Sequence, residues 1–226
     1  MKNFPKWALR TEQVALPLTA IMFGLVVAHL LAMQVIFNES LGLKEQLEIE
    51  YWHLSIFDLD EEESFGTWFS AVILLYAGRL LLRRARSARK EADPWYRWWL
   101  VLAVGFHFLS IDEVVGMHEY VNTVVENTRW TTFGAAIVAV LGLAYFPFLR
   151  ALPSRIRVLF IVAAVIYVGG AVGVERATDW YDVHNLLDTL AYNLWTAVEE
   201  TMEMAGVIVF IYALLLLETE RKKRKL

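Results

Sequence analysis

Three glutamates lie inside the longest apolar run in the C-terminal half of the chain. Glu199, Glu200 and Glu203 fall within residues 194–217, which are otherwise largely apolar. A charged side chain near the centre of a bilayer costs about 2.5–3.5 kcal/mol, so acids inside a membrane usually face a polar interior and mark a functional site. At about 100° per residue the three side chains share an arc of about 100°, which predicts a helix with one polar face.

A second group of chemically active side chains lies at the end of another apolar segment. Asp112 and Glu119 share one face of a continuous helix, while His107 and His118 share another face. Glu113 points away from both faces unless the glycine three residues later ends the helix. Carboxylate and imidazole groups in such proximity are typical of metal-binding and acid–base sites.

The two groups of acids predict a bound divalent metal ion, because crowded carboxylates cannot all ionise unless protons or a cation neutralise them. Carboxylate oxygen combined with imidazole nitrogen suits iron, zinc or manganese. The apolar spans contain none of the Glu-x-x-His pairs typical of di-iron bundles, so mononuclear and di-iron sites both stay open. The predicted metal ligands are Asp112, His118, Glu119, Glu199, Glu203, Glu63 and His107, with Glu200 and Glu113 as catalytic acid or base.

The elements that would position these groups are membrane-spanning helices. The 226 residues are 58% hydrophobic, with a mean hydropathy of +0.44, which is too apolar for an ordinary soluble domain. The absence of cysteine excludes disulfides and thiolate metal ligands. We predict an all-α, polytopic membrane protein that forms one domain over residues 1–226. Its bundle of about six transmembrane helices corresponds to apolar runs at 14–37, 65–82, 95–115, 132–149, 157–174 and 192–217.

Basic residues are sorted to one side of this predicted bundle. Of the 21 Lys and Arg, only Lys44, Arg129 and Arg176 fall on the other side. The positive-inside rule then places both termini in the cytoplasm, with an acidic segment (38–64) outside and a basic loop (79–93) inside. We interpret the basic C-terminal tail as a topology anchor and predict no nucleic-acid partner.

The topology brings polar groups from several spans into the outer half of the membrane. Glu63, Thr67 and Ser70 form a polar stripe on the second span, and His29 lies in the outer half of the first. His29 is alone in an apolar span, so we interpret it as a packed, hydrogen-bonded histidine or a residue at the lipid interface rather than a metal ligand. Polar stripes at a matched depth predict a shared interior cavity.

Three local patterns complete the predicted bundle. Residues 43–57 are expected to form a short helix on the outer surface. The aromatic residues of 95–99 are expected to form an interfacial belt. Gly169, Gly170 and Gly173 on the fifth span and Gly206 on the sixth are small residues that allow helices to approach closely.

Three sequence blocks carry a resemblance to known proteins. FDLDEEESFGTWFS (57–70), FLSIDEVVGMHE (108–119) and VEETMEMAG (198–206) together resemble a group of bacterial polytopic membrane proteins without an assigned activity. With the charge sorting, the resemblance predicts an integral protein of the bacterial inner (cytoplasmic) membrane. It implies that the shared pattern includes Glu63, Asp112, Glu113, His118, Glu119, Glu199, Glu200 and Glu203.

The leading hypothesis is a membrane-embedded, metal-dependent enzyme that opens to the outer leaflet of the bilayer. Its substrate is expected to be a lipid or another apolar molecule, and the reaction is open between hydrolysis and oxidation. One alternative is a carrier or channel for protons or divalent cations, although the cytoplasmic halves of the spans contain no further acids. The other is a non-catalytic accessory subunit. The sequence does not define the oligomeric state.

Overall fold

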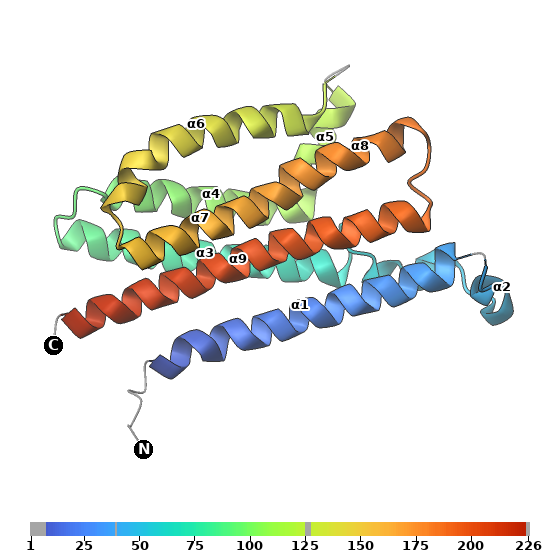
Figure 1. Ribbon diagram of the computed structural model, residues 1–226, viewed down its shortest axis with the longest axis horizontal. Helices are drawn as coiled ribbons and strands as arrows, with labels where there is room; N and C mark the ends of the chain where they lie inside the picture. The colour runs from blue at the N-terminus through green and yellow to red at the C-terminus, as the bar shows by residue number, and fades with distance from the viewer. Residues whose placement is uncertain (1–7, 39, 125–127, 225–226) are drawn as a thin grey trace.

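The computed structural model describes residues 8–38, 40–124 and 128–224 as a bundle of helices (Figure 1). Within these residues, six helical segments are long and apolar enough to cross a membrane, which confirms the predicted all-α fold of an integral membrane protein. The long helices are α1 (Ala8–Phe37), α3 (Phe65–Lys90), α4 (Tyr96–Val115), α6 (Trp130–Ala151), α7 (Ser154–Val168) continued by the π-helical η3 (Gly169–Val174) and α8 (Glu175–Val183), and α9 (Leu190–Arg224). The shorter elements are α2 (Leu43–Leu47), η1 (Tyr51–His53), η2 (Ser55–Phe57) and α5 (Met117–Val124).

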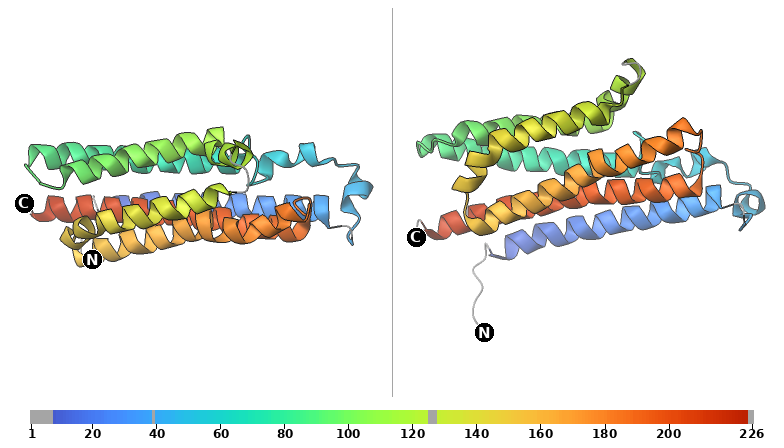
Figure 2. Two further views of the ribbon diagram at one scale, coloured as in Figure 1. Left: turned by 90° about the horizontal axis from the view of Figure 1, so that it is seen from above. Right: turned by 45° about the horizontal axis from the view of Figure 1, so that its top comes forward.

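The central helix of the bundle is α9. It packs against α1, α3 and α7, while α4 packs mainly against α3. Figure 2 shows α3 and α4 in one layer and the other long helices in a second layer. The start of α1 and the end of α9 lie at the same end of the bundle (Figure 1). Because lipid is as apolar as the core, these helices are held together by close van der Waals packing.

Two helices extend well beyond their apolar runs. The α3 helix continues to Lys90, so residues 79–90 are helical and the prediction of a loop over 79–93 is wrong for these residues. The α9 helix continues to Arg224. The added residues are mostly Arg, Lys, Leu, Ala and Glu, all of which favour helix. Long basic side chains also reach the polar headgroups from a helix end. The basic residues therefore indicate where each helix is expected to leave the hydrocarbon of the bilayer. They do not indicate where the helix ends.

The outer acidic segment does not form the single surface helix expected for residues 43–57. It contains α2, η1 and η2 in succession. The α2 helix ends because Glu48 takes a left-handed conformation, with φ 51°. Asp58 is buried and anchors the segment to the bundle. The α3 helix then begins at an N-cap, where the Ser64 hydroxyl accepts the Thr67 N–H at 3.2 Å.

Gly116 ends α4 and separates it from α5. Its φ of +60° is left-handed, a conformation that glycine adopts without steric cost. The prediction of one continuous helix through residue 119 is therefore wrong. His107 and His118 lie on different helices and do not share a face. The break is also the condition under which Glu113 is expected to join the polar interior.

The predicted close approach at small residues is confirmed at Gly170 and Gly206, where α9 meets η3 and α7, but not at Gly173, where an added Cβ would meet no atom within 4 Å. A Cβ added to Gly206 would lie 2.7 Å from the Tyr167 backbone nitrogen and 2.9 Å from the Ala163 carbonyl oxygen. A Cβ on Gly170 would lie 2.8 Å from the Glu199 carbonyl oxygen. Since these neighbours are backbone atoms, the two glycines set the spacing between the helices.

Candidate functional site

The polar face of α9 lies against the rest of the bundle. Glu199, Glu200 and Glu203 are each partly buried. A Cβ added to Gly170 would lie 3.1 Å from Glu203 Cγ, so η3 directly covers this face. A π-helical turn widens a helix locally and is frequent at functional sites.

Carboxylates from two helices meet beside a tyrosine. Glu203 and Glu200 of α9 are close enough to Glu113 of α4 to interact with it electrostatically. The Tyr167 hydroxyl of α7 lies within hydrogen-bonding reach of Glu203. We call these four side chains, Glu113, Glu200, Glu203 and Tyr167, the acid cluster. It joins α4, α7 and α9.

Further polar groups lie around the acid cluster. Glu199 interacts electrostatically with Glu175 and Asp60. The Tyr192 hydroxyl donates a hydrogen bond to Asp60 Oδ2 at 3.0 Å. Glu175, the first residue after η3, accepts a hydrogen bond from the Trp130 indole N–H. The outer segment, α6, α8 and α9 therefore contribute to one polar region.

Asp112 and His118 form a pair at the break between α4 and α5. The His118 N–H donates to Asp112 Oδ1 at 3.2 Å, and His118 Nδ1 lies 3.0 Å from Oδ2. The His118 ring packs edge-on against Trp130, with 5.1 Å between ring centroids. Asp112 also interacts electrostatically with Tyr167, which places the pair beside the acid cluster. The side chain of Glu119 lies outside the described residues.

The arginines near this region pair with acids of α8. Arg129 contacts Asp179 and Asp182, and Arg176 contacts Asp179 at 3.0 Å. The hydrogen bond to Asp182 raises the pKa of the Arg129 guanidinium above its ordinary value. Among the described residues, no Lys or Arg forms an ion pair with Glu199, Glu200 or Glu203 of α9. Their negative charge is therefore not balanced by the described basic side chains.

Two predicted ligands lie apart from the acid cluster. The His107 ring lies against α3, and its Nδ1 is 2.6 Å from the Ala103 carbonyl oxygen. Glu63 is exposed in the turn before α3, so it is not on that helix. The polar stripe expected on the second span is therefore reduced to Thr67 and Ser70, both of which are buried.

The described side chains do not form a ready metal site. Within residues 8–38, 40–124 and 128–224, no group of three or more His, Asp or Glu is arranged so that it could hold a metal ion. The acid cluster and the Asp112–His118 pair are neighbours but do not converge on one point. Coordination of a divalent cation here would require side-chain rotations that bring the carboxylates of α4 and α9 together.

Tyr167 and Asp60 are the site residues that sequence reasoning misses. Tyr167 lies three residues before Gly170 and four after Ala163, so all three share the helix face that meets α9. A tyrosine on the small-residue face of an apolar span is a usable signal. Asp60 gives no such signal, because its position depends on how the whole outer segment folds.

His29 is a packed, hydrogen-bonded histidine, as predicted. It is fully buried, its Nε2 lies 3.0 Å from the Asn193 carbonyl oxygen, and its Nδ1 accepts the Leu59 N–H at 3.1 Å. Its Nδ1 also lies 3.4 Å from Asp58 Oδ1. The ring therefore ties α1 to the start of α9 and to the outer segment.

Asp58 and Tyr51 form a hydrogen-bonded pair outside the spans. The Tyr51 hydroxyl lies 2.6 Å from Asp58 Oδ2 and 2.8 Å from Glu61 Oε1. Burial and the two carboxylates raise the pKa of Tyr51 well above its ordinary value. Burial also raises the pKa of Asp58, but the adjacent His29 ring, the Tyr51 hydroxyl and a backbone N–H outweigh it. The net pKa of Asp58 is lower than its ordinary value.

The bundle interior becomes apolar on the other side of the acid cluster. Met204 and Ile211 follow Glu203 on α9 and are buried. Phe210 packs against both Phe106 and Phe160, with ring centroids 4.8 Å and 4.6 Å apart. We call the buried residues around Phe210 the apolar layer. It separates the acid cluster from the end of the bundle where α1 begins and α9 ends.

Comparisons with known proteins place the chain in a family but give no activity. No curated protein and no solved structure matches it. A family model described as a domain of unknown function, DUF8692, matches residues 15–217. The match covers all six candidate spans in whole or in part. The chain therefore belongs to the DUF8692 family.

Proposed function

We propose that the protein is a membrane-embedded enzyme that acts on a lipid or another apolar substrate, with a divalent cation as cofactor. The acid cluster carries this proposal. Carboxylates of α4 and α9 interact beside Tyr167. No described Lys or Arg forms an ion pair with Glu199, Glu200 or Glu203. Protons or a cation must therefore balance the charge. A bound cation would polarise a substrate oxygen or activate water for hydrolysis or oxidation.

The residues of the cluster divide into two roles in this proposal. Glu203 and Asp112 would hold the cation, each from a different helix, after side-chain rotations that bring their carboxylates together. Glu113 and Glu200 transfer protons, because they lie close together on facing helices and one can donate while the other accepts. Tyr167, within hydrogen-bonding reach of Glu203, orients that carboxylate.

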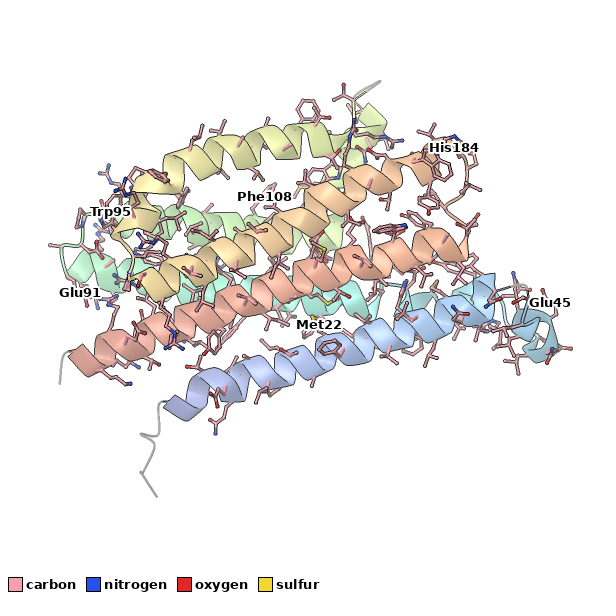
Figure 3. All side chains as sticks on the ribbon, viewed as in Figure 1. Met22, Glu45, Glu91, Trp95, Phe108 and His184 are labelled. Atoms are coloured by element: carbon pink, nitrogen blue, oxygen red, sulfur yellow. The ribbon has the colours of Figure 1, made fainter. Side chains whose placement is uncertain are left out.

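An apolar substrate has a lateral route toward this region. Between residues 132 and 144 of α6, only Gly134 is buried, so the middle of α6 hardly touches the other described helices. Phe108 of α4 (labelled in Figure 3) and Val165 of α7 are exposed on the flanks of the bundle. Lipid therefore reaches the sides of α4 and α7, the two helices that supply Glu113 and Tyr167.

The apolar layer favours an enzyme over the carrier or channel alternative. Conduction requires polar groups along the whole path. The rings around Phe210 and the buried aliphatic side chains of α9 supply none beyond Glu203. A site open to one side of the membrane fits this arrangement better than a continuous path.

Metal content per chain tests the cofactor. Wild-type protein purified after growth with added iron, zinc and manganese is compared with Glu203→Gln and Asp112→Asn by elemental analysis. We expect each variant to lose most of the metal, and the double variant to be little worse than either, because ligands of one ion act as a unit. Glu45→Gln, on exposed α2 (Figure 3), is the matched control. Glu62 is unsuitable as a control because its carboxylate lies against Gly116.

Lipid turnover tests the enzyme itself. The protein is reconstituted in vesicles made from a total bacterial lipid extract, and products are identified by mass spectrometry. Removal of the proton-transferring group in Glu200→Gln should slow product formation at least about a hundredfold, whereas Glu45→Gln should be unchanged. Full metal retention in both ligand variants would refute the shared cation, and equal product formation by wild type and Glu200→Gln would refute the enzyme.

A further inference from the structure

A cavity of about 420 Å³ lies at the end of the bundle opposite the acid cluster. The ends of α3, α6 and α9 and the start of α4 form its walls. Figure 3 shows Trp95 and Glu91 at this end of the bundle. We call it the basic-end cavity. Its charged lining residues are Arg84, Asp93 and Arg221, and its apolar lining includes Trp95, Trp99 and Leu217.

Arg84 is a buried guanidinium with unused donors. It is 6% exposed, lies 5.3 Å from the centre of the Trp99 ring, and donates from Nη2 to Asp93 Oδ2 at 2.8 Å. Neither Nε nor Nη1 has a hydrogen-bond acceptor among the described residues. The nearest charge to Nη1 is Glu91 Oε2, at 3.6 Å. Buried donors without acceptors are costly, so an acceptor is expected in the cavity.

Arg221 offers a second set of donors to the same cavity. Its Nη2 bonds to Glu91, but its Nη1 is buried and has no hydrogen-bond acceptor in the described part of the chain. The nearest carboxylate oxygen to Nη1 is Glu218 Oε1, at 3.8 Å. Two guanidinium groups from α3 and α9 therefore present unused N–H groups to one space.

The single carboxylate that lines the cavity is already engaged by the chain itself. Asp93 Oδ1 accepts the Trp95 N–H at 2.9 Å, and Oδ2 accepts the bond from Arg84. The lining therefore carries two guanidinium groups against one engaged carboxylate. Glu91 and Glu218, outside the lining, lie 3.6 Å and 3.8 Å from the two Nη1 atoms, beyond hydrogen-bonding distance, so these donors stay open to an acceptor in the cavity.

We infer that the basic-end cavity binds an anionic phosphate group through Arg84 and Arg221. Phosphate oxygens match the planar fork of a guanidinium and form strong charge-assisted hydrogen bonds with it. Trp95, Trp99 and Leu217 offer apolar contact for the glycerol and first methylenes of a phospholipid. The cavity also lies at the predicted cytoplasmic interface, where basic pockets between helices bind anionic headgroups. A soluble phosphate compound supplies the same chemistry, so the test separates the two sources.

Binding is measured on the full-length protein in a neutral detergent, with phosphatidylglycerol, phosphatidylcholine and inorganic phosphate as separate probes. Native mass spectrometry gives bound lipid, and the thermal midpoint gives stabilisation. We expect wild type to retain phosphatidylglycerol about tenfold more strongly than phosphatidylcholine. Arg221→Gln and Arg84→Gln should each remove this preference. Arg86→Gln, on the exposed face of α3, should keep it.

Each outcome decides the inference. Selective retention of phosphatidylglycerol supports it with a lipid as the source. Stabilisation by inorganic phosphate alone, lost in Arg221→Gln, supports it with a soluble source. If Arg84→Gln fails to fold, Arg221→Gln still gives the answer, because its side chain is 20% exposed. Equal loss in Arg86→Gln, or no response of wild type to either anion, overturns the inference.

Discussion

At one end of the bundle, Glu113, Glu200 and Glu203 crowd together beside a tyrosine, and no described basic residue pairs with the two on α9. At the other end, buried Arg84 lies among carboxylates and indole rings. Arginines are common at the ends of membrane helices, where their charge can reach the polar headgroups, even though some donors of Arg84 lack an acceptor within the described chain. Unbalanced acids inside a span are costly and are retained where they perform a function.

Both ends depend on α9, which carries the glutamates near its start and Arg221 near its end. The contact between α9 and α7 lies between them. A change at this contact should therefore disturb both regions, while a change at either end should leave the other intact. The following predictions separate these cases, from the largest expected effect to the smallest.

Gly206→Val should have the largest effect. Its new side chain would meet the backbone of α7, which cannot move without separating the helices. We expect a loss of about 3 kcal/mol or more in the free energy of unfolding, seen as a lower thermal midpoint and aggregation on size exclusion. Gly24→Val is the matched control, because a Cβ at Gly24 meets no atom within 4 Å. A stable Gly206→Val variant would contradict the close contact.

His29→Ala should weaken the outer end alone. The substitution leaves the Leu59 N–H and the Asn193 carbonyl without their partner, at a cost of about 2–3 kcal/mol. Limited proteolysis should show faster cleavage in residues 40–60. Phosphatidylglycerol retention at the basic-end cavity should not change. A parallel loss of lipid retention would show that the two ends are coupled more tightly than the contacts indicate.

Sequence patterns predict well how many spans there are and which residues they contain, because each span contains an apolar run long enough to cross the bilayer. They fail at the boundaries. The α3 helix runs to Lys90 because arginine and lysine are good helix formers whose long side chains tolerate the interface. They also fail in the outer segment, where a left-handed Glu48 and the buried Asp58 replace a single helix.

The candidate site is only partly predictable for a related reason. The polar face of α9 follows from helical periodicity, and its neighbour Glu113 follows once Gly116 ends α4. The orientation of His107 toward α3 and the position of Tyr167 beside Glu203 depend on which helices pack together. Trp99, expected in an interfacial belt, is 2% exposed and packs on Phe148, because α6 covers it.

Asp93→Asn should weaken the basic end by a smaller amount. The amide oxygen can still accept the Trp95 N–H, but the charge that faces Arg84 is lost. We expect a decrease of about 1–2 kcal/mol in the free energy of unfolding, because Asp93 is partly exposed. Metal content and lipid turnover at the acid cluster should not change. A variant as stable as wild type would show that Glu91 alone is sufficient for Arg84.

The smallest effect concerns acid pH and the outer segment. The pKa of Asp58 is lowered in the folded protein, so its ionised form stabilises the fold at neutral pH. This contribution is complete above the unfolded pKa, near 3.8, and is lost as the pH falls through the lower folded value. The difference in thermal midpoint between wild type and Asp58→Asn should therefore be constant from about pH 7 to pH 5 and decrease below about pH 4.

Tyr51→Phe distinguishes the source of this pH effect. The Tyr51 hydroxyl donates to Asp58, so its removal should raise the pKa of Asp58. The stability that ionised Asp58 contributes should then begin to decrease at a higher pH than in wild type. The effect should be about 1 kcal/mol, typical of one hydrogen bond to a charged group in a partly buried position. An unchanged pH profile in Tyr51→Phe would assign the lowered pKa to His29 and the backbone. A midpoint difference that is the same at pH 3 and pH 7 would contradict a charged Asp58 in the folded protein.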